Sequence, residues 1–280
     1  MSRTAQLYLV ATPIGNLEDM SPRVVRTLSE VDFIAAEDTR VLRKLLTYLG
    51  LSKKCFSYRE HNRVSQTAKI LKLLAEGQSV ALVSDAGMPL ISDPGAELVQ
   101  AVHEAGFPLT VIPGPSAVLT ALAISGLATS RFIFEGFLPP TGEERRRRIM
   151  SLQGEERSAV IFEAPHRLLR TLNDLRKYLG GERRIALTRE LTKIHEEVLL
   201  SSIDELVTSL EGSAIKGECV LVLAGAKPVI PSTGDPDRAF LLFHDLVASG
   251  MERRYALKEA ARRTGIGRDE LYQLIIEERR

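Results

Sequence analysis

The chain has 280 residues, 44% hydrophobic and 26% charged, a composition ordinary for a globular protein and a length that favours two domains over one. A formal net charge of +1 excludes a global field that attracts nucleic acid, so any RNA-binding surface must be local. The N-terminal apolar run at 7–11 is too short for a signal peptide, and no apolar run approaches the ~20 residues of a membrane helix, so we expect a cytoplasmic protein.

The first half of the chain alternates short apolar runs with segments of helical period. Strands are expected at 7–11, 33–36, 79–83 and 109–112. Helices are expected from Pro22, after Ser21 as N-cap, and at 39–49, 64–76, 97–105 and 116–124. This alternation predicts a parallel sheet with helices on both faces.

The second half has fewer and longer connections, which predict a mixed sheet. Strands are expected at 132–134, 159–162, 185–188, 198–200 and 220–223, with a helix at 167–179. A linker at 227–237 precedes about three short helices, the last two at 256–263 and 269–277. The fold class is therefore α/β, with domains expected at 1–126 and 127–228 and a small helical segment at 229–280.

Three loops that follow strands of the first half carry unusual residues: 12–17, 84–95 and 113–117. Their glycines and prolines fix unusual backbone dihedrals and leave amides and carbonyls free to hold a polar ligand. Ligands of parallel sheets bind at the carboxyl ends of strands, where these loops meet. The alternative is that 84–95 is only a long structural connection. No dinucleotide or P-loop glycine motif is present, which argues against a dehydrogenase and a P-loop NTPase.

Charged residues at 37–40 follow the second expected strand and face the same edge of the sheet. The alternative for this segment is helix capping by Asp38 or Thr39, with Arg40 a solvated neighbour.

Taken in order, the segments VATPIGNLEDMSPR, AEDTR, SDAGMPLISDPG and IPGPSA resemble the tetrapyrrole-methylase (class III) methyltransferase superfamily. FEAPHR, RELTKIHEE and KGECV are similar to the branch of that superfamily that acts on small-subunit ribosomal RNA. The resemblance covers roughly residues 6–226. Two departures stand out: ATPIGN replaces the usual G-x-G-P-G-D turn, and Ala164 replaces a serine, which puts any role for that position in doubt.

The resemblance implies a cleft between two α/β domains that binds S-adenosylmethionine in a folded shape, mainly through backbone groups. It also implies methylation of the ribose 2′-oxygen of a cytidine in the decoding region of 16S ribosomal RNA, with the RNA held in the 30S particle, by a homodimer. The residues placed in the cofactor shell are Ser84, Asp85, Ala86, Gly87, Pro89, Ile91, Ser92, Ser116, Ala117, Phe162, Leu191 and Gly217.

Methyl transfer to a hydroxyl needs alignment of the two groups and the management of one proton. Lys193 oriented by Glu190 is the expected catalytic pair, with His195, Asp38 and Glu163 as further candidates. A lysine acts as a base only if its pKa is lowered; otherwise it stabilises developing negative charge. The alternative is an interstrand charge network or a dimer contact.

Four consecutive arginines, Arg145, Arg146, Arg147 and Arg148, follow a Pro139-Pro140-Thr141-Gly142 turn and are expected to contact RNA phosphates. The alternative is a solvated helix face. The C-terminal helices have the rhythm of a helix-turn-helix, for which RNA docking and plain packing both stay open.

Two rival functions remain. One is a small-molecule methyltransferase acting on a tetrapyrrole precursor, and the other is an RNA-binding module without catalysis. No metal site is expected, because Cys55 and Cys219 have no second Cys or His at metal-ligand spacing.

Overall fold

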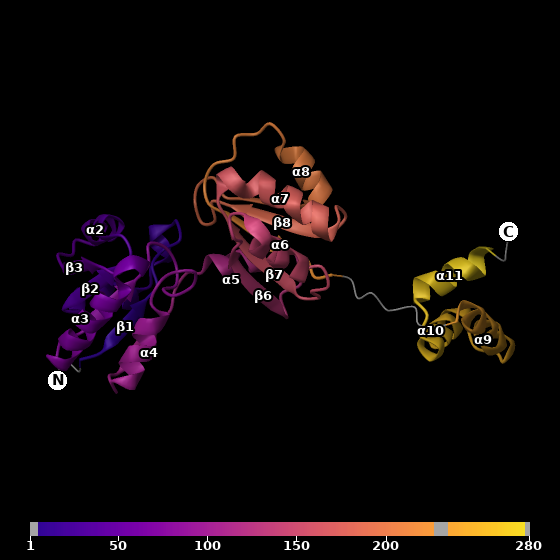
Figure 1. The fold of residues 1–280 in the computed structure, drawn as a ribbon, viewed down its shortest axis with the longest axis horizontal. Coiled ribbons are helices and arrows are strands. Elements are labelled where there is room, and N and C mark those ends of the chain that lie inside the picture. Colours follow the sequence, from indigo (N-terminus) through magenta and orange to yellow (C-terminus); the bar gives the residue numbers. More distant parts are fainter. Residues whose placement is uncertain (1–4, 227–234, 278–280) are drawn as a thin grey trace. The chain divides into compact units, whose positions relative to one another are not determined.

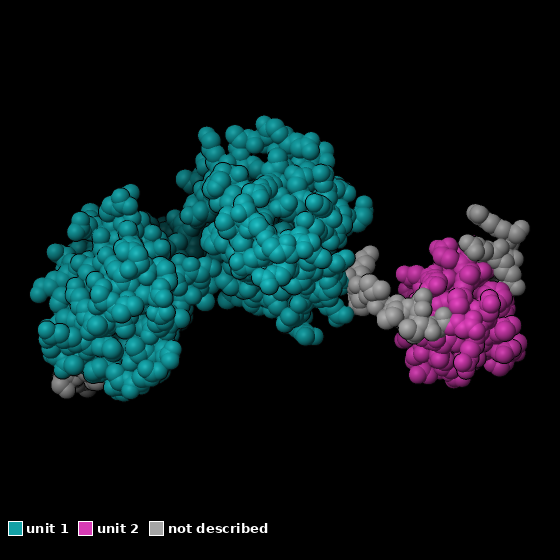
Figure 2. Space-filling model, in the orientation of Figure 1, with its two compact units in different colours: residues 1–226 teal, residues 227–280 magenta. Residues whose placement is uncertain are grey.

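A computed structural model describes residues 5–226 and 235–277 of the chain. The chain divides into two compact units, Met1–Ala226 and Lys227–Arg280 (Figure 2). Most of the expected linker, and the domain boundary expected between residues 228 and 229, lie outside the described residues. No helix within 5–226 or 235–277 is both long and apolar enough to cross a membrane.

The first sheet is entirely parallel, in the order β3-β2-β4-β1-β5. Figure 1 labels β1, β2 and β3 among these strands. Its strands are β1 (Leu7–Val10), β2 (Phe33–Ala36), β3 (Lys54–Ser57), β4 (Val80–Val83) and β5 (Leu109–Ile112). Four of these were predicted within one residue at each end. The edge strand β3 was not predicted, because its four residues include a lysine and a serine and none is fully buried.

Helices cover both faces of the first sheet, which accounts for the burial of consecutive residues in β2 and β4. The helices around it are α1 (Pro22–Glu30), α2 (Thr39–Tyr48), α3 (Arg63–Ala75) and α4 (Ala96–Glu104), with short 3-10 turns η1 (Leu17–Asp19) and η2 (Glu60–Asn62). Val10 and Val83 face α1 and α2, whereas Leu9 and Leu82 face α3 and α4. Ser21 caps α1 and Asp38 caps α2 through their side chains, which confirms the Ser21 cap and the capping alternative for Asp38.

The second sheet is mixed, as predicted, in the order β6-β7-β10-β8-β9. Only β6 and β7 are parallel neighbours. Its strands are β6 (Phe132–Phe137), β7 (Ser158–Glu163), β8 (Arg184–Arg189), β9 (Glu197–Ser202) and β10 (Cys219–Leu223), and its helices are α5 (Ala117–Ile124), α6 (Gly142–Ser151), α7 (Pro165–Leu179) and α8 (Ile203–Leu210). Helices α6 to α8 cover one face, while α5 packs Val118 and Leu122 against Val160 and Val222 on the other.

The topology of the first sheet places a ligand site between β1 and β4. These strands are neighbours, but the helices that follow them lie on opposite faces of the sheet: α1 after β1 packs on the face of Val10, and α4 after β4 packs on the face of Leu9. The loops that leave their carboxyl ends therefore diverge, which opens a crevice of the kind in which α/β sheets bind ligands.

Within residues 235–277, the C-terminal unit is a bundle of three helices, α9 (Pro236–Ala248), α10 (Arg253–Thr264) and α11 (Arg268–Glu277), which confirms the expected helical segment. Phe243, Ala256, Ala260 and Leu271 form its small core. Gly265 ends α10 in the left-handed conformation, with φ of 72°.

Candidate functional site

The loops after β1 and β4 are joined by an isolated backbone bridge. The Thr12 amide donates to the Gly87 carbonyl at 2.9 Å, and the Gly87 amide donates to the Thr12 carbonyl at 3.1 Å. Gly87 has φ of 80°, and a Cβ there would lie 3.2 Å from Cγ2 of Ile14. A side chain at position 87 would therefore disturb both loops.

Unusual backbone conformations concentrate in two loops of the first unit. In the described part of the chain, the non-glycine residues with positive φ are Leu90 and Ser92 in one loop and Glu190 and Thr192 in the other. Such conformations cost free energy and cluster at functional sites when the surrounding structure enforces them. The Asn16 amide also donates to Oγ1 of Thr192 at 3.1 Å, which ties the loop after β1 to the second of these loops.

A cavity of about 470 Å³ opens where the loops after β1 and β4 meet residues of β6, β7 and β10; we term it the larger cavity. Its volume is typical of a cofactor site. Of the predicted cofactor shell, the larger cavity brings together Asp85, Ala86, Gly87, Ile91, Ser92, Ser116, Ala117, Phe162 and Gly217.

Three predicted residues of the shell lie outside its lining. Ser84 lines a neighbouring cavity, and Pro89 is buried without lining either one. Leu191 is 6% exposed and packs in the apolar cluster that contains Ile14 and Val118, two residues of the cavity wall. It therefore supports the wall instead of forming it.

The larger cavity combines an aromatic side with a charged side. The Phe162 ring makes edge contacts with Phe134 and Phe137, at centroid distances of 5.0 and 5.5 Å. On the charged side, burial, helped by the nearby Glu37 carboxylate, raises the pKa of Asp93 to about 6. Burial and the Asp85 carboxylate likewise raise the pKa of Glu37. This acidic group favours a cationic ligand, whereas Phe162 offers an apolar face.

A charge cluster stands beside the larger cavity. The Lys193 ammonium lies 2.9 Å from Oε1 of Glu190 and 3.2 Å from Oε2 of Glu218. Glu190 Oε1 also accepts the Glu218 amide at 2.9 Å, so it fixes both partners. Burial lowers the pKa of Lys193, but its bonds to the two carboxylates outweigh burial and the net shift is upward. Of the two roles open to Lys193, this direction favours stabilising negative charge.

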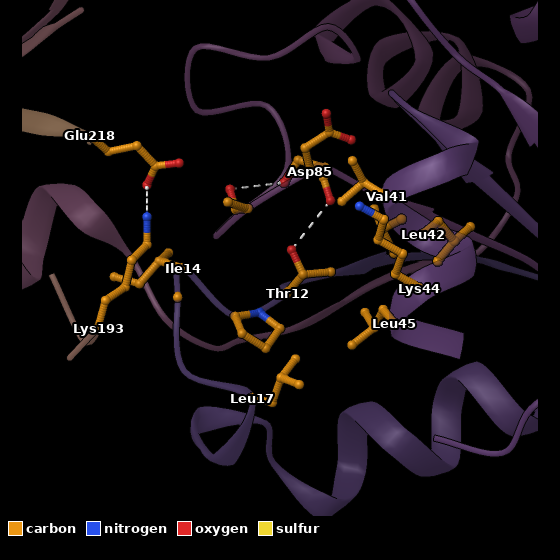
Figure 3. A pocket seen from close by; sticks show the side chains of 15 residues that line it. Thr12, Ile14, Leu17, Val41, Leu42, Lys44, Leu45, Asp85, Lys193 and Glu218 are labelled. Atoms are coloured by element: carbon orange, nitrogen blue, oxygen red, sulfur yellow. Dashed lines mark hydrogen bonds and ion pairs between the residues drawn. The ribbon is translucent and has the colours of Figure 1, made fainter. Parts of the chain in front are cut away.

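A second cavity of about 310 Å³, which we term the smaller cavity, adjoins the larger one and shares Ile14, Asp85, Ala86 and Glu218 with it. Lys193 and Glu218 lie on one side of the smaller cavity, and Val41, Lys44 and Leu45 of α2 lie opposite (Figure 3). The residues that line both cavities therefore form the boundary between the smaller cavity and the larger one.

The four arginines of α6 do not form one surface. Arg145 is 4% exposed and donates to Asp174, to Thr171 and to the Pro139 carbonyl. The predicted phosphate contact is wrong for Arg145, because its guanidinium is buried and already donates hydrogen bonds to these three partners.

The other three arginines differ in their ion pairs and in their exposure to solvent. Arg146 pairs with Glu143, and Arg148 pairs with Glu135. Arg147 is exposed. Of the run, Arg146 and Arg147 thus keep the exposure that a phosphate contact requires.

Glu218 and Phe137 are among the residues of the site that were not singled out from the sequence. Glu218 lines both cavities, and its place beside the predicted Gly217 was the available signal. Phe137 ends β6 just before the Pro139-Pro140 turn and reaches the larger cavity.

Glu163, a further catalytic candidate, is 2% exposed and bonds to Thr171 and the Ala164 amide, with Arg167 3.2 Å away. These contacts give Glu163 a structural role at the cavity wall.

Comparison with known proteins places the chain in a family. The family model described as Tetrapyrrole (Corrin/Porphyrin) Methylases matches residues 6–207. A relative from Synechocystis named Ribosomal RNA small subunit methyltransferase I is 47% identical over 97% of both chains. A Thermotoga maritima relative of the same name is 46% identical over 79% of this chain and 98% of its own.

A solved structure shares the fold at lower identity. The uroporphyrin-III C-methyltransferase of Thermus thermophilus, in complex with S-adenosyl homocysteine, aligns with a TM-score of 0.56 and 16% identity over 79% of this chain and 97% of its own. The fold is thus that of a tetrapyrrole methylase. By sequence, the chain belongs to the ribosomal RNA small subunit methyltransferase I family within the tetrapyrrole methylases.

Proposed function

We propose that this protein transfers a methyl group from S-adenosylmethionine to the ribose 2′-oxygen of a cytidine in the decoding region of 16S ribosomal RNA. The observation that carries the proposal is the larger cavity, in which nine residues of the expected cofactor shell meet from loops far apart in sequence. The names of the relatives support ribosomal RNA as the substrate.

The larger cavity fits S-adenosylmethionine by shape and by charge. A Cβ at Gly87 would lie 3.2 Å from Cγ2 of Ile14, and a Cβ at Gly217 would lie 2.5 Å from Oε1 of Glu190, so the two glycines let Ile14 and Glu190 pack closely against the wall of the cavity. Phe162 and Phe137 suit an adenine ring, and the Asp85 and Asp93 carboxylates suit a cation. The neighbour from Thermus thermophilus, which was solved with S-adenosyl homocysteine, supports the same cofactor.

The cofactor supplies an activated methyl group, so the chain itself must orient the acceptor and manage its proton. Glu190 fixes the Lys193 ammonium beside the wall that the two cavities share. There the ammonium stabilises the charge that develops on the acceptor oxygen as it loses its proton. The Glu218 carboxylate, whose side chain is 71% exposed, accepts that proton and passes it to solvent.

The catalytic part is expected to reside in Met1–Ala226. Nearly the whole Thermotoga maritima relative aligns with 220 residues here, close to the length of this unit, and both cavities lie within it. A homodimer working on the 30S particle in the cytoplasm completes the proposal.

Methyl transfer to defined substrates tests this function. The purified protein and radiolabelled S-adenosylmethionine should label 30S particles from cells that lack the gene, and nucleoside mass spectrometry should identify one 2′-O-methylcytidine. Labelling of a uroporphyrinogen instead would favour the tetrapyrrole rival. No binding of S-adenosylmethionine in a calorimetric titration would favour the non-catalytic RNA-binding module.

A further inference from the structure

The smaller cavity has features of a second ligand site. Two of the large apolar side chains that stay exposed in the described part of the chain, Leu17 at 39% and Val41 at 41%, both line it. Leu45 adds a third apolar surface, and Lys44 adds a cation on the same helix. Exposed apolar side chains that gather on one cavity mark a surface that a ligand covers.

The position of this cavity relates it to the reaction. Ile14, Asp85, Ala86 and Glu218 line both cavities, so the two adjoin at these residues, and Lys193 stands at the same side. A hydroxyl held in the smaller cavity at this boundary could therefore approach a methyl group held at the boundary of the larger one. Transfer in line needs such a direct approach of the oxygen to the methyl carbon.

We propose that the smaller cavity binds the acceptor nucleotide, turned out of its RNA helix, with the base against Leu17, Val41 and Leu45 and with Lys44 on its phosphate. This inference rests on the proposed function and adds the acceptor site to it. Enzymes that act on a nucleotide within a stacked helix take it out into a pocket, where apolar side chains replace the lost stacking. The ribose hydroxyl then points at the shared wall, beside Lys193.

The charges of the smaller cavity indicate which base it accepts. The Asp85 carboxylate is an acceptor that lines the smaller cavity apart from the Lys193–Glu218 ion pair (Figure 3), whereas Lys193 and Glu218 are already bound to each other. A carboxylate accepts a hydrogen bond from the exocyclic amino group of cytosine. Uracil presents a carbonyl at that position, which a carboxylate repels. The cavity therefore suits cytidine over uridine.

Two variants of α2 test the acceptor site, each with a matched control. Val41→Trp fills the cavity, and Val64→Trp places the same side chain on α3, where Val64 is 76% exposed. Lys44→Ala removes the cation, and Arg43→Ala removes the exposed cation next to it, which does not line the cavity. Circular dichroism melting verifies that each variant is folded.

Steady-state methylation of 30S particles and calorimetric titration of S-adenosylmethionine give the two readouts. We expect Val41→Trp to lower kcat/KM at least about 10-fold and Lys44→Ala to raise the KM for 30S particles about 5-fold. The Kd for S-adenosylmethionine should stay within about 2-fold in both, and the controls should match the wild type. The proposed acceptor site would be wrong if Val41→Trp and Lys44→Ala had the same kinetics as their controls. It would also be wrong if Val41→Trp lost cofactor binding.

A direct binding measurement separates this inference from the proposed function. Cytidine 5′-monophosphate, titrated in the presence of S-adenosyl homocysteine and followed by NMR line broadening, should bind the wild type and the Val64→Trp control but not Val41→Trp. If the wild type methylated no 30S particle yet showed this pattern, the proposed function would fail and the acceptor site would stand. Equal binding of cytidine and uridine monophosphates, or binding that Val41→Trp leaves intact, would count against it.

Discussion

The two sheets of the first unit contribute to the site in different ways. The parallel sheet offers mainly backbone, because its loops carry Gly87 at positive φ and the Thr12–Gly87 bridge. The mixed sheet offers mainly side chains: Phe162 from β7 and, beyond β8, Glu190 and Lys193. This contrast predicts that changes to the backbone of the loops of the first sheet act on cofactor binding, whereas changes to Glu190 and Lys193 beyond the second sheet act on the rate of the chemical step.

The largest effect is expected at Gly87, on the backbone side of the comparison. Gly87→Val puts a β-branched residue at φ of 80° and a Cβ against Ile14, so it should weaken S-adenosylmethionine binding more than about 100-fold, or about 2.7 kcal/mol. Calorimetric titration measures this. Gly50→Val, at φ of 66° with no neighbour within 4 Å, is the control for strain alone. Equal affinity in Gly87→Val and Gly50→Val would show that the loop is only structural.

The second-largest effect is expected at Lys193, whose side chain belongs to the part of the site that the mixed sheet provides. Lys193→Met keeps the apolar stem but removes the ammonium, and should lower kcat about 100-fold while leaving the Kd for S-adenosylmethionine within about 3-fold. Glu190→Gln should lower kcat less, because Lys193 keeps Glu218 as a partner. Single-turnover methylation of 30S particles separates the rate from binding. If Lys193→Met lost cofactor affinity and kept its rate, the division between the sheets would be wrong.

A third prediction uses the arginines of α6. Arg145→Ala leaves the Asp174 carboxylate without its ion-pair partner and removes the donor to Thr171, so it should lower the free energy of unfolding by about 3 kcal/mol. Arg147→Ala, on the exposed side, should change it by less than about 0.5 kcal/mol. Urea denaturation followed by circular dichroism measures both. Equal stability of the two variants would contradict the buried position of Arg145.

The smallest effect is the pH dependence at Asp93. Because folding raises the pKa of Asp93 from 3.8 to about 6, the protonated carboxyl stabilises the fold below pH 3.8, and this contribution is lost as the pH rises through about 6. Asp93→Asn should therefore raise Tm at pH 7.5, with a difference from the wild type that shrinks towards pH 4.

The same substitution should weaken the binding of S-adenosylmethionine at pH 7.5 a few-fold, because the ionised carboxylate favours a cation. Differential scanning fluorimetry with and without the cofactor measures both effects. A Tm difference that stayed constant from pH 4 to pH 7.5 would speak against a raised pKa at Asp93.

Local patterns made much of this fold predictable from the sequence. The bounds of β2 and β5 match their apolar runs, and the Ser21-Pro22 pair predicted the start of α1, since capping depends on neighbouring residues. The Glu190–Lys193 bond was predicted for the same reason, because its partners are three residues apart.

Long-range contacts set the limit of that prediction. Asp174, the partner of Arg145, lies on another helix, so four adjacent arginines looked alike in the sequence. Glu218 reaches Lys193 only because β8 and β10 pair, and the smaller cavity exists only because α2 faces the loop that contains Lys193. The individual residues of such a site follow from the pairing of strands, which no local pattern encodes.

A crystal structure of the protein with S-adenosyl homocysteine would test the central claim most directly. We predict that the ligand occupies the larger cavity, in contact with Gly87, Ser116 and Phe162, and leaves the smaller cavity open beside Lys193. Density for the ligand between Val41 and Lys193, or away from both cavities, would contradict the account.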